Sequence, residues 1–361
     1  MKILQVFPGR VWGGAEQFIL DMGNTFENAY NEVRYMAYDE SAVSSRLGRE
    51  GISYSVIPSR WAFSSATVDA MASAMEDCDV VHIHDVSFAP AAVRARRKSG
   101  SKALIVMHRH DAHRTPANIF YRPYLKQIDR AVFVSDLARR CWHGANKWFP
   151  AEKCTVVLNS TPPERVRKVV SLREKYHIAP TTPLLVFCGR VKKTKGVHIL
   201  LEALSRLADR DFALVIVGKA AKDSYLRKLR RIAERGGIID RTFYFGYSDQ
   251  ARSFLREADI ALAPSVGKES FALTNIEAMM AGACVVTTDN GGQTEYIEDG
   301  RTGLLVPPGD PAALADAIRK LLDNPDLRKR IAKAGKEYAE ANMTYSNFID
   351  KIMAVYTTKT P

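Results

Sequence analysis

The sequence has no long apolar run. Its longest nearly continuous apolar stretch, around Ala278–Val286, is far shorter than the roughly 18 residues that span a bilayer. The segment Met1–Arg10 contains a short apolar run that Gln5 interrupts and Pro8 ends, too short for the core of a signal peptide. We therefore expect no transmembrane helix and a cytoplasmic location.

Cysteine is also scarce. The five cysteines are scattered singly, without a Cys-x-x-Cys pair, and their number is odd. This distribution argues against a disulfide framework and suggests no zinc site, so we expect small buried thiols. The chain also lacks internal repeats and low-complexity segments.

Basic residues outnumber acidic ones, which gives a net charge of +12. The excess is spread along the chain without a recognition motif, which argues against a nucleic-acid partner. Two local clusters, Arg94–Lys98 and Arg227–Arg231 with Arg235, lie late in predicted helices, where cations interact favourably with the helix dipole. An anionic membrane surface is the alternative explanation for these clusters.

Strands alternate with helices along the whole chain. With 361 residues, of which 46% are hydrophobic, the chain is long enough for two α/β cores. The alternation predicts parallel sheets that are covered on both faces. The predicted strands are Lys2–Phe7, Val80–His84, Ala103–Met107, Ala131–Val134, Leu184–Cys188, Ala213–Val217, Thr242–Phe245, Ile260–Ala263 and Cys284–Thr287.

A linker is predicted at Asn159–Pro163, because its prolines end regular structure and its polar residues favour turns. The alternation begins again after this segment. The sequence therefore predicts two doubly wound, Rossmann-like domains, residues 1–163 and residues 164–344. In such folds ligands bind beyond the carboxyl ends of the strands, so we expect the site in a cleft between the domains.

A basic loop follows the predicted strand Leu184–Cys188. Arg190 stands at the carboxyl end of this strand, and Lys195-Gly196 leads into the next helix. The planar fork of arginine and the point charge of lysine both suit phosphate oxygens. Taken alone, a basic loop between a strand and a helix is more often a solvated connection.

A second segment, Pro264–Gly282, opens a helix after another strand. The first backbone N–H groups of a helix favour an anion, and here they belong to Phe271, Ala272 and Leu273. The carboxylates of Glu269 and Glu277 would repel a bare anion, but they suit the hydroxyls of a ribose or another sugar. The alternative is that Glu269 interacts with the helix dipole and that Glu277 is a surface residue.

Two motifs could in principle bind a metal. Asp77-Cys78-Asp79 precedes the Val80–His84 strand, at the amino end of the sheet, where we expect a turn between a helix and a strand. We expect His82 and His84 to face opposite sides of that strand, so that at least one of them is structural. The sequence therefore predicts no metal site.

Together, these motifs resemble the retaining glycosyltransferases of the GT-B fold, and specifically the large family 4, also called glycosyl transferases group 1. The matching segments are Arg190…Lys195-Gly196, Glu269-x7-Glu277, Asn290–Ile297, Gly303–Asp310, Gly13–Glu16, Asp79–His84 and Val134-Ser135. The resemblance covers nearly the whole chain. Each motif is weak alone, whereas the ordered set is specific.

The resemblance implies two facing Rossmann-like domains with the site in the cleft between them, and a C-terminal helix 345–361 that returns to the first domain. It also implies that Arg190 and Lys195 hold the diphosphate of a nucleotide-sugar donor. By the same resemblance, Glu277 binds the ribose hydroxyls and Glu269 the transferred sugar.

Further roles follow from the same resemblance. Phe271, Ala272 and Leu273 would donate backbone N–H groups to phosphate and sugar, although Ala272 replaces the usual glycine of the family. Gly13 and Gly14 would approach the phosphate from the first domain. His108, at the end of its strand, matches the histidine that faces the donor sugar, with His110 and His113 as neighbouring alternatives.

The implied function is retaining transfer of a hexose from a nucleoside-diphosphate sugar to a glycan or lipid-linked acceptor, in bacterial surface polysaccharide or glycolipid assembly. Arg190, Lys195 and the helix N-terminus would stabilise the charge of the leaving diphosphate without a metal or another cofactor. A peripheral contact of the protein with the inner face of an anionic membrane is a further possibility. The alternatives are another GT-B enzyme, such as a sugar-nucleotide epimerase or a phosphorylase, and a non-catalytic nucleotide-sugar-binding protein.

Overall fold

The computed structural model describes residues 1–7, 9–29, 31–61, 63–113, 117–162, 170–248 and 250–358. The chain forms two compact units: unit 1 contains Met1–Asn159 and Ser346–Pro361, and unit 2 contains Ser160–Tyr345. The chain thus enters unit 2 just before the prolines of the predicted linker. None of the helices in the described ranges combines the length and apolarity that a membrane span requires.

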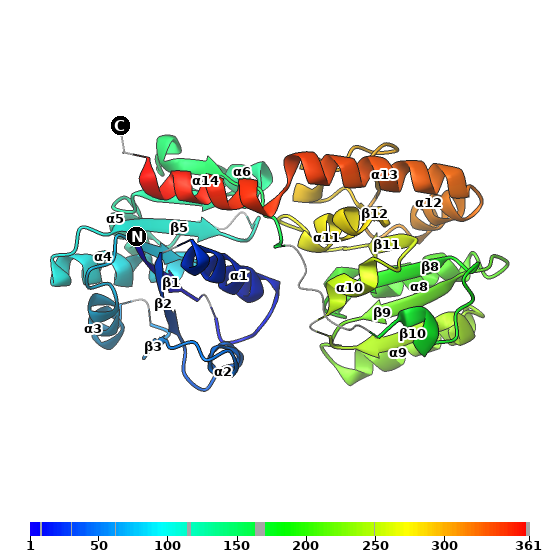
Figure 1. The fold of residues 1–361 in the computed structure, drawn as a ribbon, viewed down its shortest axis with the longest axis horizontal. Helices are drawn as coiled ribbons and strands as arrows, with labels where there is room; N and C mark the ends of the chain where they lie inside the picture. The colour runs from blue at the N-terminus through cyan, green and yellow to red at the C-terminus, as the bar shows by residue number, and fades with distance from the viewer. Residues whose placement is uncertain are drawn as a thin grey trace. The chain divides into compact units, whose positions relative to one another are not determined.

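Unit 1 is built on a sheet that has seven strands among the described residues, in the order β3-β2-β1-β4-β5-β6-β7 (Figure 1). All of its strand pairs are parallel. The strands are β1 (Lys2–Val6), β2 (Glu32–Ala37), β3 (Ser55–Val56), β4 (Val80–Ile83), β5 (Leu104–Arg109), β6 (Arg130–Phe133) and β7 (Cys154–Val156). The central strands are almost wholly buried, as expected where helices cover both faces of a parallel sheet.

The helices of unit 1 include the last helix of the chain. They are α1 (Gly14–Asn28), α2 (Ala42–Arg49), α3 (Ser65–Ala74), α4 (Ala89–Ser99), α5 (Arg122–Leu125), α6 (Asp136–Ala145) and α14 (Tyr345–Thr357), with short 3-10 turns η1 (Val86–Phe88), η2 (Ile119–Tyr121) and η3 (Ala151–Lys153). Phe348 of α14 packs on Phe18 of α1, with ring centroids 5.0 Å apart. The C-terminal helix is therefore part of the unit 1 core.

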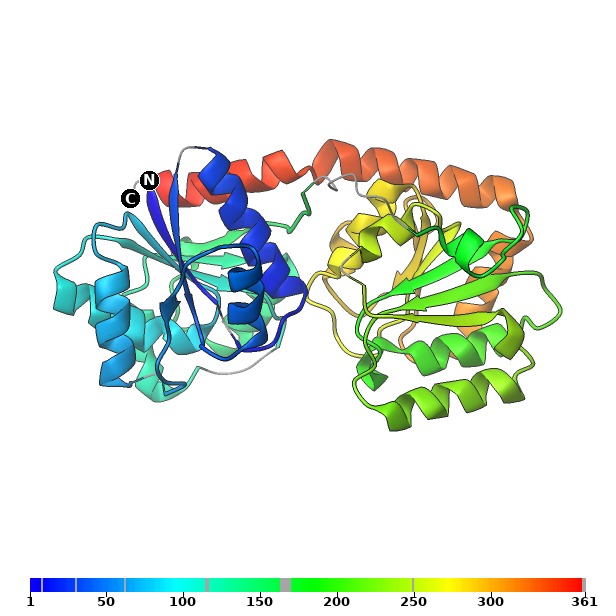
Figure 2. The ribbon, with the colours of Figure 1, turned by 60° about the horizontal axis from the view of Figure 1, so that its bottom comes forward.

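Unit 2 contains a second parallel sheet, with strand order β10-β9-β8-β11-β12-β13. The strands are β8 (Leu184–Cys188), β9 (Ala213–Val217), β10 (Thr242–Gly246), β11 (Ile260–Ala263), β12 (Cys284–Thr288) and β13 (Leu304–Val306). The helices are α7 (Leu172–Lys175), α8 (Val197–Ser205), α9 (Asp223–Arg235), α10 (Ala251–Leu255), α11 (Leu273–Ala281), α12 (Pro311–Leu322) and α13 (Pro325–Asn342), with 3-10 turns η4 (Lys193–Lys195), η5 (Ile239–Arg241) and η6 (Gly292–Glu295). In Figure 2, α8 and α9 lie on one face of this sheet and α11 and α13 on the other.

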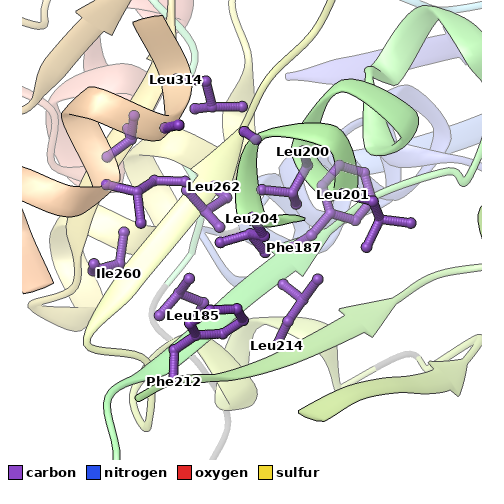
Figure 3. Packing of buried hydrophobic residues seen from close by; sticks show 14 of the residues in the cluster. Leu185, Phe187, Leu200, Leu201, Leu204, Phe212, Leu214, Ile260, Leu262 and Leu314 are labelled. Atoms are coloured by element: carbon purple, nitrogen blue, oxygen red, sulfur yellow. The ribbon is translucent and has the colours of Figure 1, made fainter. Parts of the chain in front are cut away.

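The core of unit 2 joins its central strands to α8. Leu185 of β8 and Leu262 of β11 lie in one buried cluster with Leu200 and Leu204 of α8 (Figure 3). Burial of each such side chain contributes roughly 1.5–3 kcal/mol. The cluster fixes β8 beside β11, and these two strands lead into the loops that carry the predicted donor site.

The strand order reverses beside the first strand of each sheet. In unit 2, β8 lies between β9 and β11, and in unit 1, β1 lies between β2 and β4. Ligands of open α/β sheets bind at such a switch point, beyond the carboxyl ends of the strands. The loops after β8 and β11 carry Arg190, Lys195 and Glu269, so the topology brings these predicted residues to the switch point of unit 2.

The predicted α/β class with parallel sheets is confirmed, and each predicted strand is present with small differences at its ends. Four strands were not predicted: β2, β3, β7 and β13. Three of these are short and lie at sheet edges, where the sequence signal of a buried strand is weakest. The predicted turn at Asp77–Asp79 is also confirmed: it precedes β4, at the amino end of the sheet.

Candidate functional site

The loop after β8 is joined directly to the loop after β11. The carbonyl oxygen of Thr194 accepts hydrogen bonds from the N–H groups of Val266 at 3.0 Å and Gly267 at 2.9 Å. Gly196, which begins α8 with φ +72°, approaches Pro264 so closely that a Cβ atom would lie 1.8 Å from the proline carbonyl oxygen. Only glycine permits this approach, which holds the two loops together.

Lys195 and Glu269 form an ion pair across these two loops. The Nζ atom of Lys195 lies 2.6 Å from Oε1 of Glu269, and the hydroxyl of Ser265 donates to the same oxygen at 2.5 Å. The side chains of Lys195 and Glu269 are 27% and 17% exposed, so a ligand can still reach the pair. The two residues predicted to contact the diphosphate and the sugar therefore occupy one site.

Two further cations lie at the carboxyl end of β8. Arg190 is exposed, and Lys192 is partly buried beside it. Burial lowers the pKa of Lys192, and the charges of Arg190 and Lys195 lower it further. Clustered cations of this kind attract an anion. Lys192 was not predicted as a site residue, although the basic composition of its loop was a usable signal.

The N-terminus of α11 lies in the same loop region as Glu269. Its N-cap residue is Ala272, and the first N–H groups of a helix have no acceptor within it. The hydroxyl of Tyr296 donates to the carbonyl oxygens of Phe271 at 2.5 Å and Ala272 at 3.0 Å, which anchors this turn from the protein interior. The predicted backbone donors Phe271, Ala272 and Leu273 thus stand at a helix start.

The segment after β12 supports the Glu269 loop. Asn290 donates through its side-chain amide to the carbonyl oxygens of Ser265 and Val266, each at 3.1 Å. The N–H of Gly292 donates to the carbonyl oxygen of Glu269 at 2.9 Å. At Gly291 a Cβ atom would lie 2.3 Å from that same oxygen, so a side chain there would push the Glu269 loop away. The motif was recognised in the sequence, but its supporting role was not.

Glu277, on α11, pairs with an arginine that was not predicted. Its Oε1 atom lies 2.7 Å from Nε of Arg252 on α10, and the two side chains are 15% and 27% exposed. Burial raises the pKa of the Cys188 thiol, and the charge of Glu277 adds to this effect, which places Glu277 near the end of β8. No sequence motif includes Arg252, so its role could only be found from the structure.

The predicted residues of unit 1 lie around the carboxyl ends of β1 and β5. Gly13 is the N-cap of α1 and Gly14 its first residue. His108 is fully buried within β5, whereas His110 follows the strand and is half-buried. The role of His108 toward the donor sugar therefore stays a prediction, and His110 is the better exposed of the two within unit 1.

The expectation that His82 and His84 face opposite sides was wrong. Residues two apart on a strand share a face, and these two rings stack with centroids 4.3 Å apart. The ring of His108, on the neighbouring β5, is parallel to that of His82 within 3°. Both ring nitrogens of His84 are hydrogen-bonded, to His110 at 2.9 Å and to Gln5 at 2.8 Å.

The histidines come close enough to be considered as metal ligands. The nearest ring nitrogens of His82, His84 and His108 lie within 4.8 Å of one another. A zinc ion needs nitrogen lone pairs that converge on one point at about 2.0–2.1 Å. Stacked rings instead direct their lone pairs side by side, which suits zinc poorly. Within the described residues, Nε2 of His82 and both ring nitrogens of His108 have no hydrogen-bond partner. The prediction that the chain has no metal site stays a prediction.

Two parallel α/β units in series, with the predicted donor residues at the switch point of the second, define the GT-B class of glycosyltransferases. The crystal structure of Anabaena HepE in complex with UDP and glucose has this fold: it aligns with a TM-score of 0.83 at 20% identity, over 98% of this chain and 98% of that chain. Residues 12–165 match the family Glycosyltransferase Family 4, and residues 170–338 match Glycosyl transferases group 1.

Curated relatives agree with this family. The phosphatidyl-myo-inositol mannosyltransferase of Mycobacterium leprae is 30% identical over 362 residues, which cover 96% of this chain and 93% of the relative. The lipopolysaccharide 1,2-N-acetylglucosaminetransferase of Salmonella typhimurium is 28% identical over 267 residues, 70% of this chain and 67% of the relative. The chain belongs to glycosyltransferase family 4, the glycosyl transferases group 1, and is a glycosyltransferase.

Proposed function

We propose that unit 2 binds the donor with its diphosphate between the N-terminus of α11 and the cations Arg190 and Lys195. The observation that carries this assignment is the Lys195–Glu269 ion pair beside that helix start. A cation and a carboxylate in contact offer adjacent positions for a phosphate oxygen and a sugar hydroxyl. Glu277 then accepts the ribose hydroxyls, and no metal or other cofactor is required.

The chemical step needs charge stabilisation at the leaving group. As the bond to the anomeric carbon breaks, negative charge builds on the diphosphate, and Arg190, Lys192 and Lys195 face it together with the helix N-terminus. Because Lys195 is paired with Glu269 in the described structure, the donor must share or displace that contact. Unit 1 would contribute Gly13 and Gly14 toward the phosphate, and His108 or His110 toward the sugar.

The acceptor class follows from the relatives. One relative is named as a mannosyltransferase of phosphatidyl-myo-inositol and another as a lipopolysaccharide transferase. We therefore propose a glycolipid or a lipid-linked glycan as the acceptor, in bacterial surface polysaccharide or glycolipid assembly. The reaction then takes place at the inner face of a membrane.

The donor assignment is tested by Arg190→Ala and Lys195→Ala, with Lys193→Ala as a matched control because Lys193 is an exposed lysine of the same loop. Loss of one charged hydrogen-bond partner costs roughly 1.5–3 kcal/mol, which is about a 10- to 150-fold loss of transfer rate. The measurement is sugar transfer to a lipid acceptor, with folding checked by thermal unfolding. Near-normal turnover of both site variants would contradict the assignment.

The same assay separates the alternatives that the sequence left open. An epimerase would convert the nucleotide sugar without joining it to an acceptor. A phosphorylase would release a sugar phosphate from a glycan in the presence of phosphate and would not consume a nucleotide sugar. A non-catalytic sensor would bind the nucleotide sugar and leave it intact. Product analysis of the wild-type reaction therefore decides between these functions before any variant is compared.

A peripheral membrane contact is supported by an exposed patch on unit 1, which we call the aromatic patch. Trp61, Ile119 and Phe120 are 67%, 64% and 67% exposed. Their segments adjoin each other, because the ring of Phe63 packs on that of Tyr121 at 5.6 Å. Three exposed cations lie close to these residues in the sequence: Arg60 precedes Trp61, Arg122 lies two residues after Phe120, and Lys126 is the C-cap of α5. Apolar tips with surrounding cations suit an anionic bilayer surface.

The predicted basic clusters contribute less to this surface. In the first cluster, Arg96 is bonded to Asp129 at 2.5 Å and Lys98 to Asp69 at 2.6 Å, so internal contacts engage its charge. The second cluster lies on the exposed side of α9, in unit 2. We therefore assign the proposed membrane contact to the aromatic patch, where exposed apolar side chains lie near basic residues of the sequence.

Vesicle sedimentation tests the membrane contact. We expect binding to vesicles that contain phosphatidylglycerol, and weaker binding to pure phosphatidylcholine, since each lysine or arginine near an anionic surface contributes about 1 kcal/mol. The double variant Trp61→Ser/Phe120→Ser should lose this binding, while Tyr247→Ser, an exposed aromatic of unit 2, should retain it. Equal binding of both variants would contradict the assignment to unit 1.

A further inference from the structure

We propose that Arg252 is a positioning residue that holds Glu277 in the conformation that recognises the ribose of the donor. The inference rests on the proposed donor site, in which Glu277 accepts the ribose hydroxyls. Its direct basis is the 2.7 Å contact between Nε of Arg252 and Oε1 of Glu277. Both side chains are largely buried, at 27% and 15% exposure, so water screens the pair less than it screens a surface ion pair.

The ion pair gives Glu277 an orientation before the ligand arrives. Fixing a long, flexible side chain such as glutamate costs up to about 2 kcal/mol of rotamer entropy. A charge-assisted hydrogen bond from Arg252 meets part of that cost in the folded protein. A carboxylate offers about four acceptor positions on two oxygens, so one carboxylate can serve an arginine and ribose hydroxyls together.

Arg252 is itself held by its surroundings. It lies on α10, which packs against α11, and its Nη1 atom also contacts the carbonyl oxygen of Pro162 at 3.5 Å. Pro162 belongs to the segment through which the chain enters unit 2. In that segment the hydroxyl of Ser160 donates to the carbonyl oxygen of Met343 at 2.6 Å, near the point where the chain leaves unit 2. The guanidinium of Arg252 therefore connects Glu277 to a segment that is itself held by a hydrogen bond to the end of unit 2.

A positioning role and a purely structural role predict different losses. If Arg252 only stabilised unit 2, Arg252→Ala would lower the unfolding temperature and would weaken the binding of every nucleotide to the same extent. If Arg252 positions Glu277, the loss depends on the hydroxyl that Glu277 recognises. Arg252→Ala then weakens the binding of a 2′-deoxynucleotide only slightly, because that ligand lacks one of the hydroxyls that Glu277 would bind.

The experiment compares UDP, GDP and their 2′-deoxy forms by calorimetry. We expect wild type to bind at least one ribonucleotide about tenfold or more tightly than its deoxy form, the range of a hydrogen bond to a charged group. Arg252→Ala should reduce this ratio toward one, and Arg252→Lys should restore part of it. Arg230→Ala, which removes an arginine paired with Glu234 on the exposed side of α9, should leave the ratio unchanged.

Steady-state kinetics provides a second readout. The ribose does not react, so Arg252→Ala should raise the KM for the donor more than it lowers kcat. An unchanged ratio of ribonucleotide to deoxynucleotide affinity in Arg252→Ala would overturn the inference while leaving the donor site intact. Parallel losses for both nucleotides in Arg252→Ala and Arg252→Lys would also overturn it. Failure of wild type to bind either UDP or GDP would instead count against the proposed donor site.

Discussion

At Ala272 the backbone adopts φ +63° and ψ +67°, the left-handed conformation, immediately before α11. This conformation costs a residue with a Cβ atom roughly 1–2 kcal/mol. The sequence showed only that alanine stands where the family usually has glycine. The structure shows that this position has a backbone conformation that favours glycine, and the hydrogen bonds from Tyr296 help to hold the strained turn.

We predict that Ala272→Gly stabilises the protein. Relief of the left-handed strain exceeds the roughly 0.5–1 kcal/mol that glycine loses through its more flexible unfolded state, which leaves a gain of about 0.5–1 kcal/mol. Urea denaturation measures the change. The control is Ala278→Gly in the interior of the same helix, which should destabilise by about 1 kcal/mol or more. Similar destabilisation by both variants would contradict the strain argument.

At the scale of elements, β4 and β5 bring four histidines to one face of the sheet. His82 stacks on His84 and on His108, and His110 stacks on the same two rings. His82 hydrogen-bonds to the hydroxyl of Tyr356 on α14 at 2.6 Å. Burial lowers the pKa of His82 to about 3 and that of His110 to about 4, and it lowers the pKa of the other two well below the usual value. The stack therefore stays neutral in the folded state.

This stack predicts an acid-sensitive stability. Above the unfolded-state pKa of about 6.5 both states are neutral, so the histidines impose no cost. As the pH falls below that value, the histidines become protonated in the unfolded chain but stay neutral in the folded protein. Each histidine then lowers the free energy of unfolding by about 1 kcal/mol per pH unit, until the pH reaches its folded-state pKa. We expect the unfolding temperature to fall between pH 6.5 and pH 4.

Thermal unfolding from pH 7.5 to pH 4.5 checks this expectation. The variant His82→Phe keeps a ring of similar size but removes one titrating group, so its stability should depend less steeply on pH, whatever its stability at pH 7.5. His113→Phe, at an exposed position after β5, is the matched control. Its unfolding temperature should depend on pH as steeply as that of wild type. Identical slopes for all three proteins would show that the buried stack is not the cause.

At the scale of the whole molecule, the residues proposed to meet the leaving-group charge come from one unit. Arg190, Lys192, Lys195 and the start of α11 surround the switch point of unit 2. We therefore predict that transfer activity persists in EDTA within about twofold, since fixed cations supply the electrostatic stabilisation of the transition state. A rate assay with and without chelator measures this. Loss of activity in EDTA with recovery in magnesium would contradict the prediction.

The sequence by itself determined the features that depend on local signals. Short β-rich runs between amphipathic helices indicated parallel α/β architecture, because burial on both faces of a sheet requires continuous apolar strands. The ordered set of motifs around Arg190, Lys195, Glu269 and Glu277 resembled the family, and that resemblance indicated a donor site. These patterns are readable because the relevant residues are neighbours in the chain.

Only the tertiary structure decided how distant residues meet. Arg252 reaches Glu277 because α10 packs on α11, and Lys195 reaches Glu269 because β8 lies beside β11. His82 and His108 stack because β4 pairs with β5. Such contacts depend on strand order and helix packing, which are set by burial over the whole unit and leave no fixed spacing in the sequence.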